Sequence, residues 1–164
     1  MIYTERLQIR KYTLLDAPFI YELMNSEGWL KNIGNRNINS IADAEAYLER
    51  HYLSIYSSQG FGPYKVLLKD SSTAIGSCGL YKRDNLDFPD IGFAFLPEFV
   101  GQGYALEAAK AIMKYASEEL KIEKIVGITL PENITSVKLL KKIGLAEIGT
   151  YNFEYVEELL LFST

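Results

Sequence analysis

The stretch of residues 90–116 constrains the fold more than any other, because it predicts a buried strand, a glycine turn and a helix in immediate succession. The nearly continuous apolar run 91–96 is typical of a strand that is buried on both faces, and Pro97 ends it because proline has no N–H for a sheet. Helical spacing of apolar residues begins at Ala105. Small side chains dominate this helix face, so we expect the helix to pack closely on a sheet: Ala105, Ala108, Ala109, Ile112 and Ala116.

The turn between this strand and helix is a candidate anion site. The first N–H groups of a helix have no partner within the helix, and Gly101 and Gly103 leave them open to a ligand. A dinucleotide-binding G-x-G-x-x-G motif would need a third glycine where Leu106 stands, and no G-x-x-x-x-G-K-[ST] string occurs. The turn therefore predicts a phosphate site of another class, the alternative being a turn that binds nothing.

Composition limits the class of protein. With 164 residues, of which 48% are hydrophobic and 23% charged, the chain is expected to form one domain over residues 1–164. The net charge of −4 favours neither nucleic acid nor an anionic membrane as a partner. There is no apolar signal core and no run of about 20 apolar residues, so we expect a cytoplasmic protein. A single cysteine, Cys78, and a single histidine, His51, argue against a disulfide and against a metal site.

The remaining elements alternate between strand and helix patterns. Asp16 is the expected N-cap of an early helix, and Ser40 with Asp43 resembles a capping box. Between the two helices we expect a looser segment, 26–39. The predicted strands are 6–11, 64–68, 74–81, 91–96, 124–129, 146–151 and 155–162, and the predicted helices are 16–24, 40–55, one from 105 onward, and 134–143.

This succession resembles the GNAT superfamily of acetyl-CoA-dependent N-acetyltransferases over essentially the whole chain. Three sequence motifs are most similar to the Rim-type branch of this superfamily: Ile91-Gly92-Phe93, Gly101-Gln102-Gly103-Tyr104-Ala105 and Asn133-Ile134-Thr135-Ser136. That branch includes acetyltransferases of ribosomal-protein N-termini. The resemblance implies an α/β fold of the α+β kind. Its mixed, mostly antiparallel seven-stranded sheet would be splayed after the fourth strand and would carry helices on both faces.

The resemblance also implies which residues bind acetyl-CoA. Val100 stands where the family usually has Gln or Arg, so one phosphate contact is expected to be missing. The implied cofactor-binding residues are Val100, Gly101, Gln102, Gly103, Tyr104 and Ala105 around the pyrophosphate, and Phe93, Ala94, Phe95, Leu96, Asn133 and Ser136 along the pantetheine and thioester. A backbone N–H of the strand would face the thioester oxygen, as in an oxyanion hole. The alternative interpretations are that residues 100–105 form an ordinary turn, that residues 93–96 are only core residues of a strand, and that Asn133 is only a helix N-cap.

The chemistry requires a neutral amine that attacks a thioester. At pH 7 an α-amine is roughly 10–15% neutral and a lysine about 0.04%, so an N-terminal amine needs less help from a base. Asp90 is the candidate base, acting through water, and its alternative is a solvated acid at a strand end. Many GNAT enzymes have a tyrosine acid seven residues after the asparagine, but this chain has Leu140 there. Ser136, Tyr104 or solvent would then supply the proton.

The acceptor is expected to bind where family members differ. Trp29, Ile33 and Phe61 are candidates for its walls, and Lys82, with Arg83, for contact with an acidic acceptor; packing and solvated charges are the alternatives. The implied function is direct acetyl transfer to a primary amine, either a protein N-terminal α-amine or a small amine. The alternative is a catalytically weak CoA-binding regulator or scaffold. Twelve tyrosines favour a homodimer.

Overall fold

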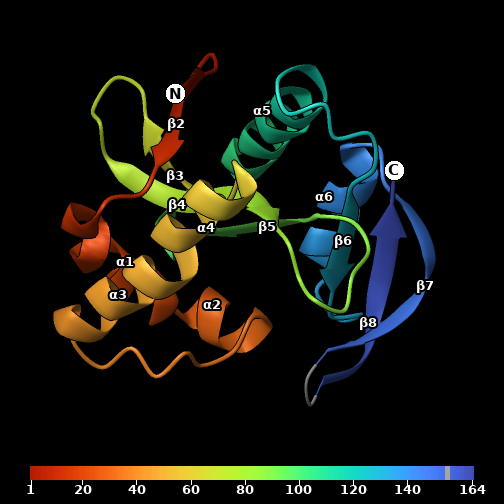
Figure 1. The fold of residues 1–164 in the computed structure, drawn as a ribbon, viewed down its shortest axis with the longest axis horizontal. Helices are drawn as coiled ribbons and strands as arrows, with labels where there is room; N and C mark the ends of the chain where they lie inside the picture. Colours follow the sequence, from red (N-terminus) through yellow and green to blue (C-terminus); the bar gives the residue numbers. More distant parts are fainter. Residues whose placement is uncertain (154–155) are drawn as a thin grey trace.

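The computed structural model describes residues 1–153 and 156–164, which form one mixed sheet with helices on both faces (Figure 1). The eight strands lie in the order β1-β2-β3-β4-β5-β6-β8-β7. They are β1 Ile2–Tyr3, β2 Leu7–Lys11, β3 Pro63–Leu68, β4 Ala74–Tyr81, β5 Asp90–Phe95, β6 Val126–Thr129, β7 Ala146–Phe153 and β8 Val156–Ser163. The α-helices are α1 Ala17–Met24, α2 Glu27–Asn32, α3 Ile41–Leu48, α4 Ser54–Gln59, α5 Tyr104–Glu118 and α6 Ile134–Lys142. Short helical turns are η1 Leu14–Asp16, η2 Glu49–Leu53 and η3 Pro97–Phe99.

The sheet has one strand more than the seven expected. The added strand is β1, whose two residues pair antiparallel with β2 through Ile2↔Ile9 and Tyr3↔Gln8. A two-residue strand is too short to show alternation, which is why the sequence did not predict it. Strand 155–162 was expected to begin at Tyr155, which lies outside the described residues; β8 is described from Val156.

The sheet divides between β5 and β6. These two strands run parallel and pair only at Asp90↔Val126, supported by the bond from the Val126 N–H to the Pro89 carbonyl at 2.9 Å. The β4 and β5 strands, by contrast, pair over six positions from Gly76↔Phe95 to Tyr81↔Asp90. Beyond Asp90, the edge of β5 that faces β6 therefore has no strand partner among residues 1–153 and 156–164. The expected splay after the fourth expected strand is confirmed.

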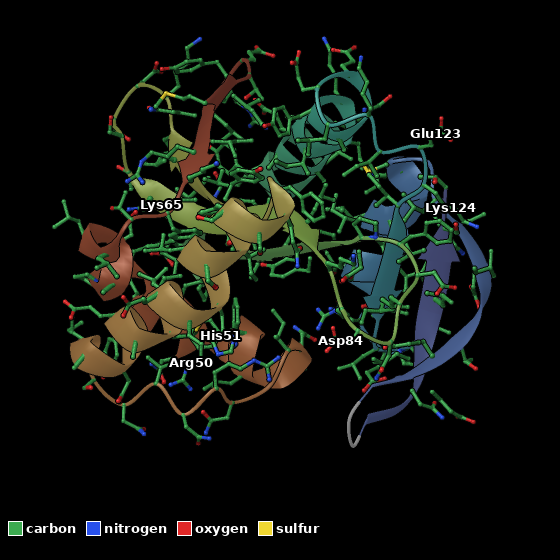
Figure 2. All side chains as sticks on the ribbon, in the orientation of Figure 1. Arg50, His51, Lys65, Asp84, Glu123 and Lys124 are labelled. Carbon is green, nitrogen blue, oxygen red and sulfur yellow. The ribbon has the colours of Figure 1, made fainter. Side chains whose placement is uncertain are left out.

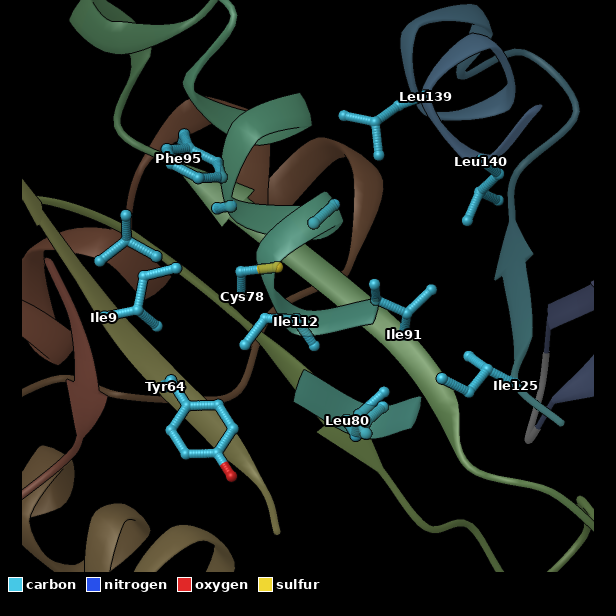
Figure 3. Packing of buried hydrophobic residues seen from close by; sticks show 14 of the residues in the cluster. Ile9, Tyr64, Cys78, Leu80, Ile91, Phe95, Ile112, Ile125, Leu139 and Leu140 are labelled. Atoms are coloured by element: carbon cyan, nitrogen blue, oxygen red, sulfur yellow. The ribbon is translucent and has the colours of Figure 1, made fainter. Parts of the chain in front are cut away.

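Each face of the sheet has its own core. On one face the small residues of α5, Ala108, Ala109 and Ala116, are fully buried, as expected, and Ile112 packs among Cys78, Leu80 and Ile91 (Figure 3). Small side chains bring this helix close to the strands. The second core joins α1, α2 and α3 over the opposite face, and its buried members include Ile20, Leu23, Ala44, Leu48 and Trp29.

Two helical expectations need correction. The segment 26–39 is not entirely loose, because α2 occupies Glu27–Asn32 after Ser26 in extended conformation. The helix expected over 40–55 is interrupted by the π-helical turn Glu49–Leu53, where the hydrogen bonds span five residues. This turn buries Tyr52 and leaves His51 exposed. At the start of α3, the Ser40 hydroxyl accepts a bond from the Asp43 N–H at 3.0 Å, which confirms Ser40 as the N-cap. The Asp43 carboxylate accepts from the Asn39 N–H and not from Ser40, so the expected capping box is only half formed.

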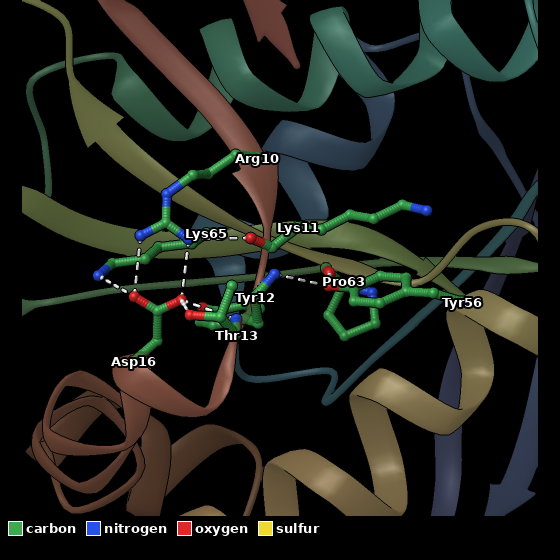
Figure 4. A network of polar contacts seen from close by, with 8 residues as sticks. All are labelled: Arg10, Lys11, Tyr12, Thr13, Asp16, Tyr56, Pro63 and Lys65. Atoms are coloured by element: carbon green, nitrogen blue, oxygen red, sulfur yellow. Dashed lines mark hydrogen bonds and ion pairs between the residues drawn. The ribbon is translucent and has the colours of Figure 1, made fainter.

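Asp16 precedes α1, but its carboxylate makes no capping bond to that helix. Instead it is buried and pairs with Arg10 at 2.8 Å and with Lys65 at 2.7 Å, and it accepts a bond from the Thr13 N–H at 2.9 Å (Figure 4). Burial opposes ionisation, but these cations and the amide bond lower the pKa of Asp16 well below its usual range. The carboxylate thus ties β2 and β3 to the start of α1. In the same network, the Tyr56 hydroxyl donates to the Pro63 carbonyl.

Candidate active site

A cavity of about 600 Å³ opens where the sheet divides. Its floor is the backbone of β5 from Asp90 to Phe95, and one end is the turn before α5. The other walls are the end of β6, the first turns of α6 and the helix α2. Of the residues singled out in the sequence, this cavity brings together Asp90, Phe93, Ala94, Phe95, Val100, Gly101, Gly103, Ala105, Asn133, Ser136, Trp29 and Ile33.

Some of the residues singled out do not line the cavity. Leu96 is buried in the second core, and Gln102 is exposed with its side-chain amide donating to the Glu98 carbonyl at 2.7 Å. Phe61 packs against the first core, and Lys82 is exposed. Tyr104 begins α5, with its ring beneath the guanidinium of Arg6.

The turn before α5 has the backbone that its glycines permit. Gly101 and Gly103 have φ of +83° and +84°, in the left-handed region that side chains disfavour. A Cβ added at Gly101 would meet nothing within 4 Å, and Gly103 is the N-cap of α5. The first N–H groups of a fifteen-residue helix therefore lie beside the cavity, with the positive end of the helix dipole.

Arg6 braces this turn, a role that the sequence did not reveal. Its guanidinium donates to the Gln102 carbonyl at 3.1 Å, pairs with Glu107 at 2.7 Å and lies 4.4 Å from the centre of the Tyr104 ring. Glu107 also accepts bonds from the Thr4 hydroxyl at 2.6 Å and the Arg6 N–H at 2.9 Å. The contacts join positions about a hundred residues apart, so no local pattern predicts them.

Asp90 is 1% exposed at the start of β5, so the alternative of a solvated strand-end acid is wrong. Its carboxylate accepts a bond from Arg83 Nε at 2.9 Å. Burial raises the pKa of Asp90 above its usual value, although Arg83 acts in the opposite direction. A carboxyl held in this way can exchange a proton at higher pH than an exposed aspartate.

The start of α6 presents polar groups to the cavity. The Asn133 side-chain oxygen accepts a bond from the Ser136 N–H at 3.2 Å and caps the helix. Ser136 and Leu139 follow at helical spacing on the cavity side. Leu140 is 1% exposed and packs on β6, where a Cβ at Gly127 would meet its side chain at 2.6 Å (Figure 3 shows Leu140 beside Leu139). Position 140 therefore belongs to the core in this chain.

Trp29, at the α2 wall, is 6% exposed, and its indole Nε1 has no hydrogen-bond partner among the residues that the structure describes. A buried N–H without a partner is energetically unfavourable, so this group suits a hydrogen bond to a ligand.

Cys78 lies outside the cavity lining and is fully buried in β4. Burial strongly raises the pKa of its thiol, which argues against an acyl-cysteine intermediate. Within residues 1–153 and 156–164, no group of three or more His, Cys, Asp or Glu side chains is placed to hold a metal ion. No helix of this described part is long and apolar enough to cross a bilayer.

The split sheet, its cavity and the glycine turn at a helix N-terminus together form the site that the resemblance to acetyltransferases implies. The chain belongs to the GNAT acetyltransferase family, because residues 6–146 match the model of the acetyltransferase (GNAT) domain. It is therefore an enzyme of the N-acetyltransferase class.

Similar proteins agree with this assignment. The chain is 31% identical over 150 residues to the uncharacterized N-acetyltransferase YnaD of Bacillus subtilis, covering 92% of this chain and 85% of that protein. A GNAT-family acetyltransferase from Bacillus anthracis is 26% identical, with a TM-score of 0.78 over 99% of this chain and 95% of that one. RimL, a ribosomal α-N-protein acetyltransferase solved with coenzyme A, shares the fold at 15% identity, with a TM-score of 0.84 over 98% and 94% of the two chains.

Proposed function

We propose that this protein transfers the acetyl group of acetyl-CoA directly to a primary amine in the cavity at the split of the sheet. The observation that carries the proposal is the edge of β5 beyond Asp90↔Val126, which has no strand partner among the described residues and lines the same cavity as the glycine turn before α5. One ligand can lie along both. GNAT acetyltransferases use acetyl-CoA, and RimL is seen with coenzyme A.

The acetyl-CoA pyrophosphate is proposed to lie on the N–H groups from Gly101 to Ala105. These amides carry the positive end of the α5 dipole, and each such contact stabilises an anion by about 0.3–1 kcal/mol. Val100 supplies no charged side chain, so the backbone carries most of this binding. The two positive-φ glycines keep Cβ atoms away from the phosphates.

The pantetheine and thioester are proposed to lie along the free edge of β5, from Phe93 to Phe95; Leu96, which was also expected to contact them, lies in the second core. Unpaired N–H and C=O groups of a strand edge are ready partners for an extended amide chain. One of these N–H groups is proposed to face the thioester oxygen and stabilise the charge that develops on it. On the opposite wall, Asn133 uses its oxygen for capping, and its amide nitrogen makes no bond within the described part of the chain. That nitrogen and the Ser136 hydroxyl are the proposed contacts near the sulfur.

Asp90 is the proposed base and acts through water. The attacking amine must lose a proton when its nitrogen bonds to the thioester carbon, and the raised pKa of Asp90 improves its match to that proton. The CoA sulfur then leaves as a thiolate or takes a proton from Ser136 or solvent. Leu140 faces the core, so this position supplies no general acid.

The test combines binding with turnover. Isothermal titration is expected to show acetyl-CoA binding, and thiol release is expected when peptides with free N-termini or small amines are added. Acetyl-CoA binding without thiol release across the whole panel would favour the alternative of a CoA-binding regulator. If acetyl-CoA does not bind, the proposed donor site is wrong.

A further inference from the structure

A second pocket, of about 580 Å³, lies next to the proposed acetyl-transfer site. It is an open depression bordered by the segment that follows α2, by one face of α3, by the turn η2 and by Arg83 of the loop between β4 and β5. Arg36, Tyr47 and Arg83 line both this pocket and the cavity at the split sheet, so the two spaces adjoin. We call the second space the arginine pocket; its lining residues are Asn35, Arg36, Asn37, Ile38, Asp43, Ala46, Tyr47, Arg50, His51 and Arg83.

The charge of this pocket is opposite to that of the whole chain, whose net charge is −4. Three arginines line it against a single carboxylate, Asp43. Asp43 is engaged at the start of α3, where it accepts a bond from the Asn39 N–H at 2.9 Å. Arg83 is paired with Asp90. Among the described residues, no carboxylate lies within ion-pair distance of Arg36 or Arg50.

The fold brings these cations together from separate elements. Asp43, Tyr47 and Arg50 recur at helical spacing, so α3 and the following turn present them on one side. Arg36 comes from the segment after α2. Figure 2 labels Arg50 and His51 on the α3–η2 segment and Asp84 on the β4–β5 loop; Asp84 does not line the pocket. The rings of Tyr47 and His51 lie with centroids 4.5 Å apart and form part of the wall.

The arginines of the pocket act on the two aromatic side chains of its wall. Arg36 and Arg83 both act on the Tyr47 hydroxyl, whose pKa is raised by burial and lowered in part by these two cations. Burial, Arg50 and Arg36 all lower the pKa of His51.

We propose that the acceptor is a primary amine that also carries a carboxylate, with the amine near Asp90 and the carboxylate in the arginine pocket between Arg36 and Arg50. This inference rests on the proposed acetyl transfer and names its acceptor class. A guanidinium binds a carboxylate through two parallel N–H bonds, so two arginines can select for it. Polyamines and other polycationic amines are excluded, because their second charge would meet like charge in this pocket.

The test uses two matched peptide amides, Ala-Glu-amide and Ala-Gln-amide, which differ only in charge. The wild-type enzyme is expected to acetylate the glutamate peptide with kcat/KM at least about tenfold higher, as for a charge-assisted hydrogen bond. Free glutamate and spermidine complete the panel. They separate a peptide carboxylate from an amino-acid carboxylate and test the exclusion of polycations.

The variants are Arg36→Gln, Arg50→Gln and their combination. The double variant is expected to lose the preference, so that its kcat/KM for the glutamate peptide falls to the value for the glutamine peptide. Lys114→Gln is the matched control, because Lys114 is an exposed cation on α5 paired loosely with Glu118 at 3.9 Å. It is expected to keep the full preference.

Binding is measured independently through the fluorescence of Trp29, the single tryptophan, which lines the acceptor side of the cavity. In titrations on the CoA complex, which has no acetyl group to transfer, tighter binding of the glutamate peptide than of the glutamine peptide supports the inference independently of turnover. Equal binding and equal rates for the two peptides, a preference that survives in the double variant, or a preference for spermidine would overturn it. Failure of acetyl-CoA to bind would instead refute the donor site.

Discussion

Gly101→Ala and Gly144→Ala form a matched pair that isolates the phosphate role of the turn before α5. Both glycines have positive φ, +83° and +98°, and a Cβ at either position meets nothing within 4 Å. Each alanine should therefore destabilise the fold only through backbone strain, by about 1–2 kcal/mol. For a chain of this size that lowers Tm by about 2–8 °C. Only Gly101 lines the cavity.

The two variants should differ in acetyl-CoA affinity. If the Gly101 change displaces the pyrophosphate from two amides, each contributing about 0.3–1 kcal/mol, the loss is about 0.6–2 kcal/mol, or about 3- to 30-fold in Kd. Gly144→Ala should leave Kd unchanged. Isothermal titration measures Kd and calorimetry measures Tm. Equal Kd values for the two variants, at equal loss of Tm, would refute the phosphate role of the turn.

Three other changes probe the site and the fold. Asp90→Asn should lower the rate chiefly at low pH, where little free amine exists; an unaltered pH–rate profile removes Asp90 from the mechanism. Asp16→Asn should destabilise the fold by about 3–5 kcal/mol at pH 7, because Lys65 would lose its buried carboxylate partner. Because the pKa of Asp16 is lowered, its contribution is present above pH 4 and lost on acidification, which urea melts against pH would show. Cys78→Ala should still turn over; inactivity with intact acetyl-CoA binding would indicate an acyl-cysteine.

Local pattern was sufficient where a feature depends on neighbouring residues. The buried strand β5, the glycine turn and α5 follow one another in sequence, so apolar periodicity, Pro97 and the two glycines predicted them together. The resemblance to GNAT enzymes added the split after β5, which periodicity alone does not reveal. Ser26 followed by Glu27 is typical of a helix start, but Gly28 disfavours a helix, so the sequence pattern did not predict α2.

Contacts between distant segments were beyond prediction. Asp90 was found as a candidate base, but its pairing with Arg83 depends on the path of the β4–β5 loop. Asp16 was read as a cap, whereas β2 and β3 bring Arg10 and Lys65 to it. The brace from Arg6 to Glu107 and the arginine pocket likewise arise from elements that meet only in the folded chain.

The strands β5 and β6 are paired at one residue pair, Asp90↔Val126, and this has a mechanical consequence. Across most of the split the two parts of the sheet are not cross-linked by backbone bonds, so a relative displacement breaks few interactions there. The helices α5 and α6 also contact each other and so link the two parts. A thioester bound in the split would contact both parts of the sheet and hold them together. Its departure after transfer would free the two parts to move relative to each other when the next acetyl-CoA molecule binds.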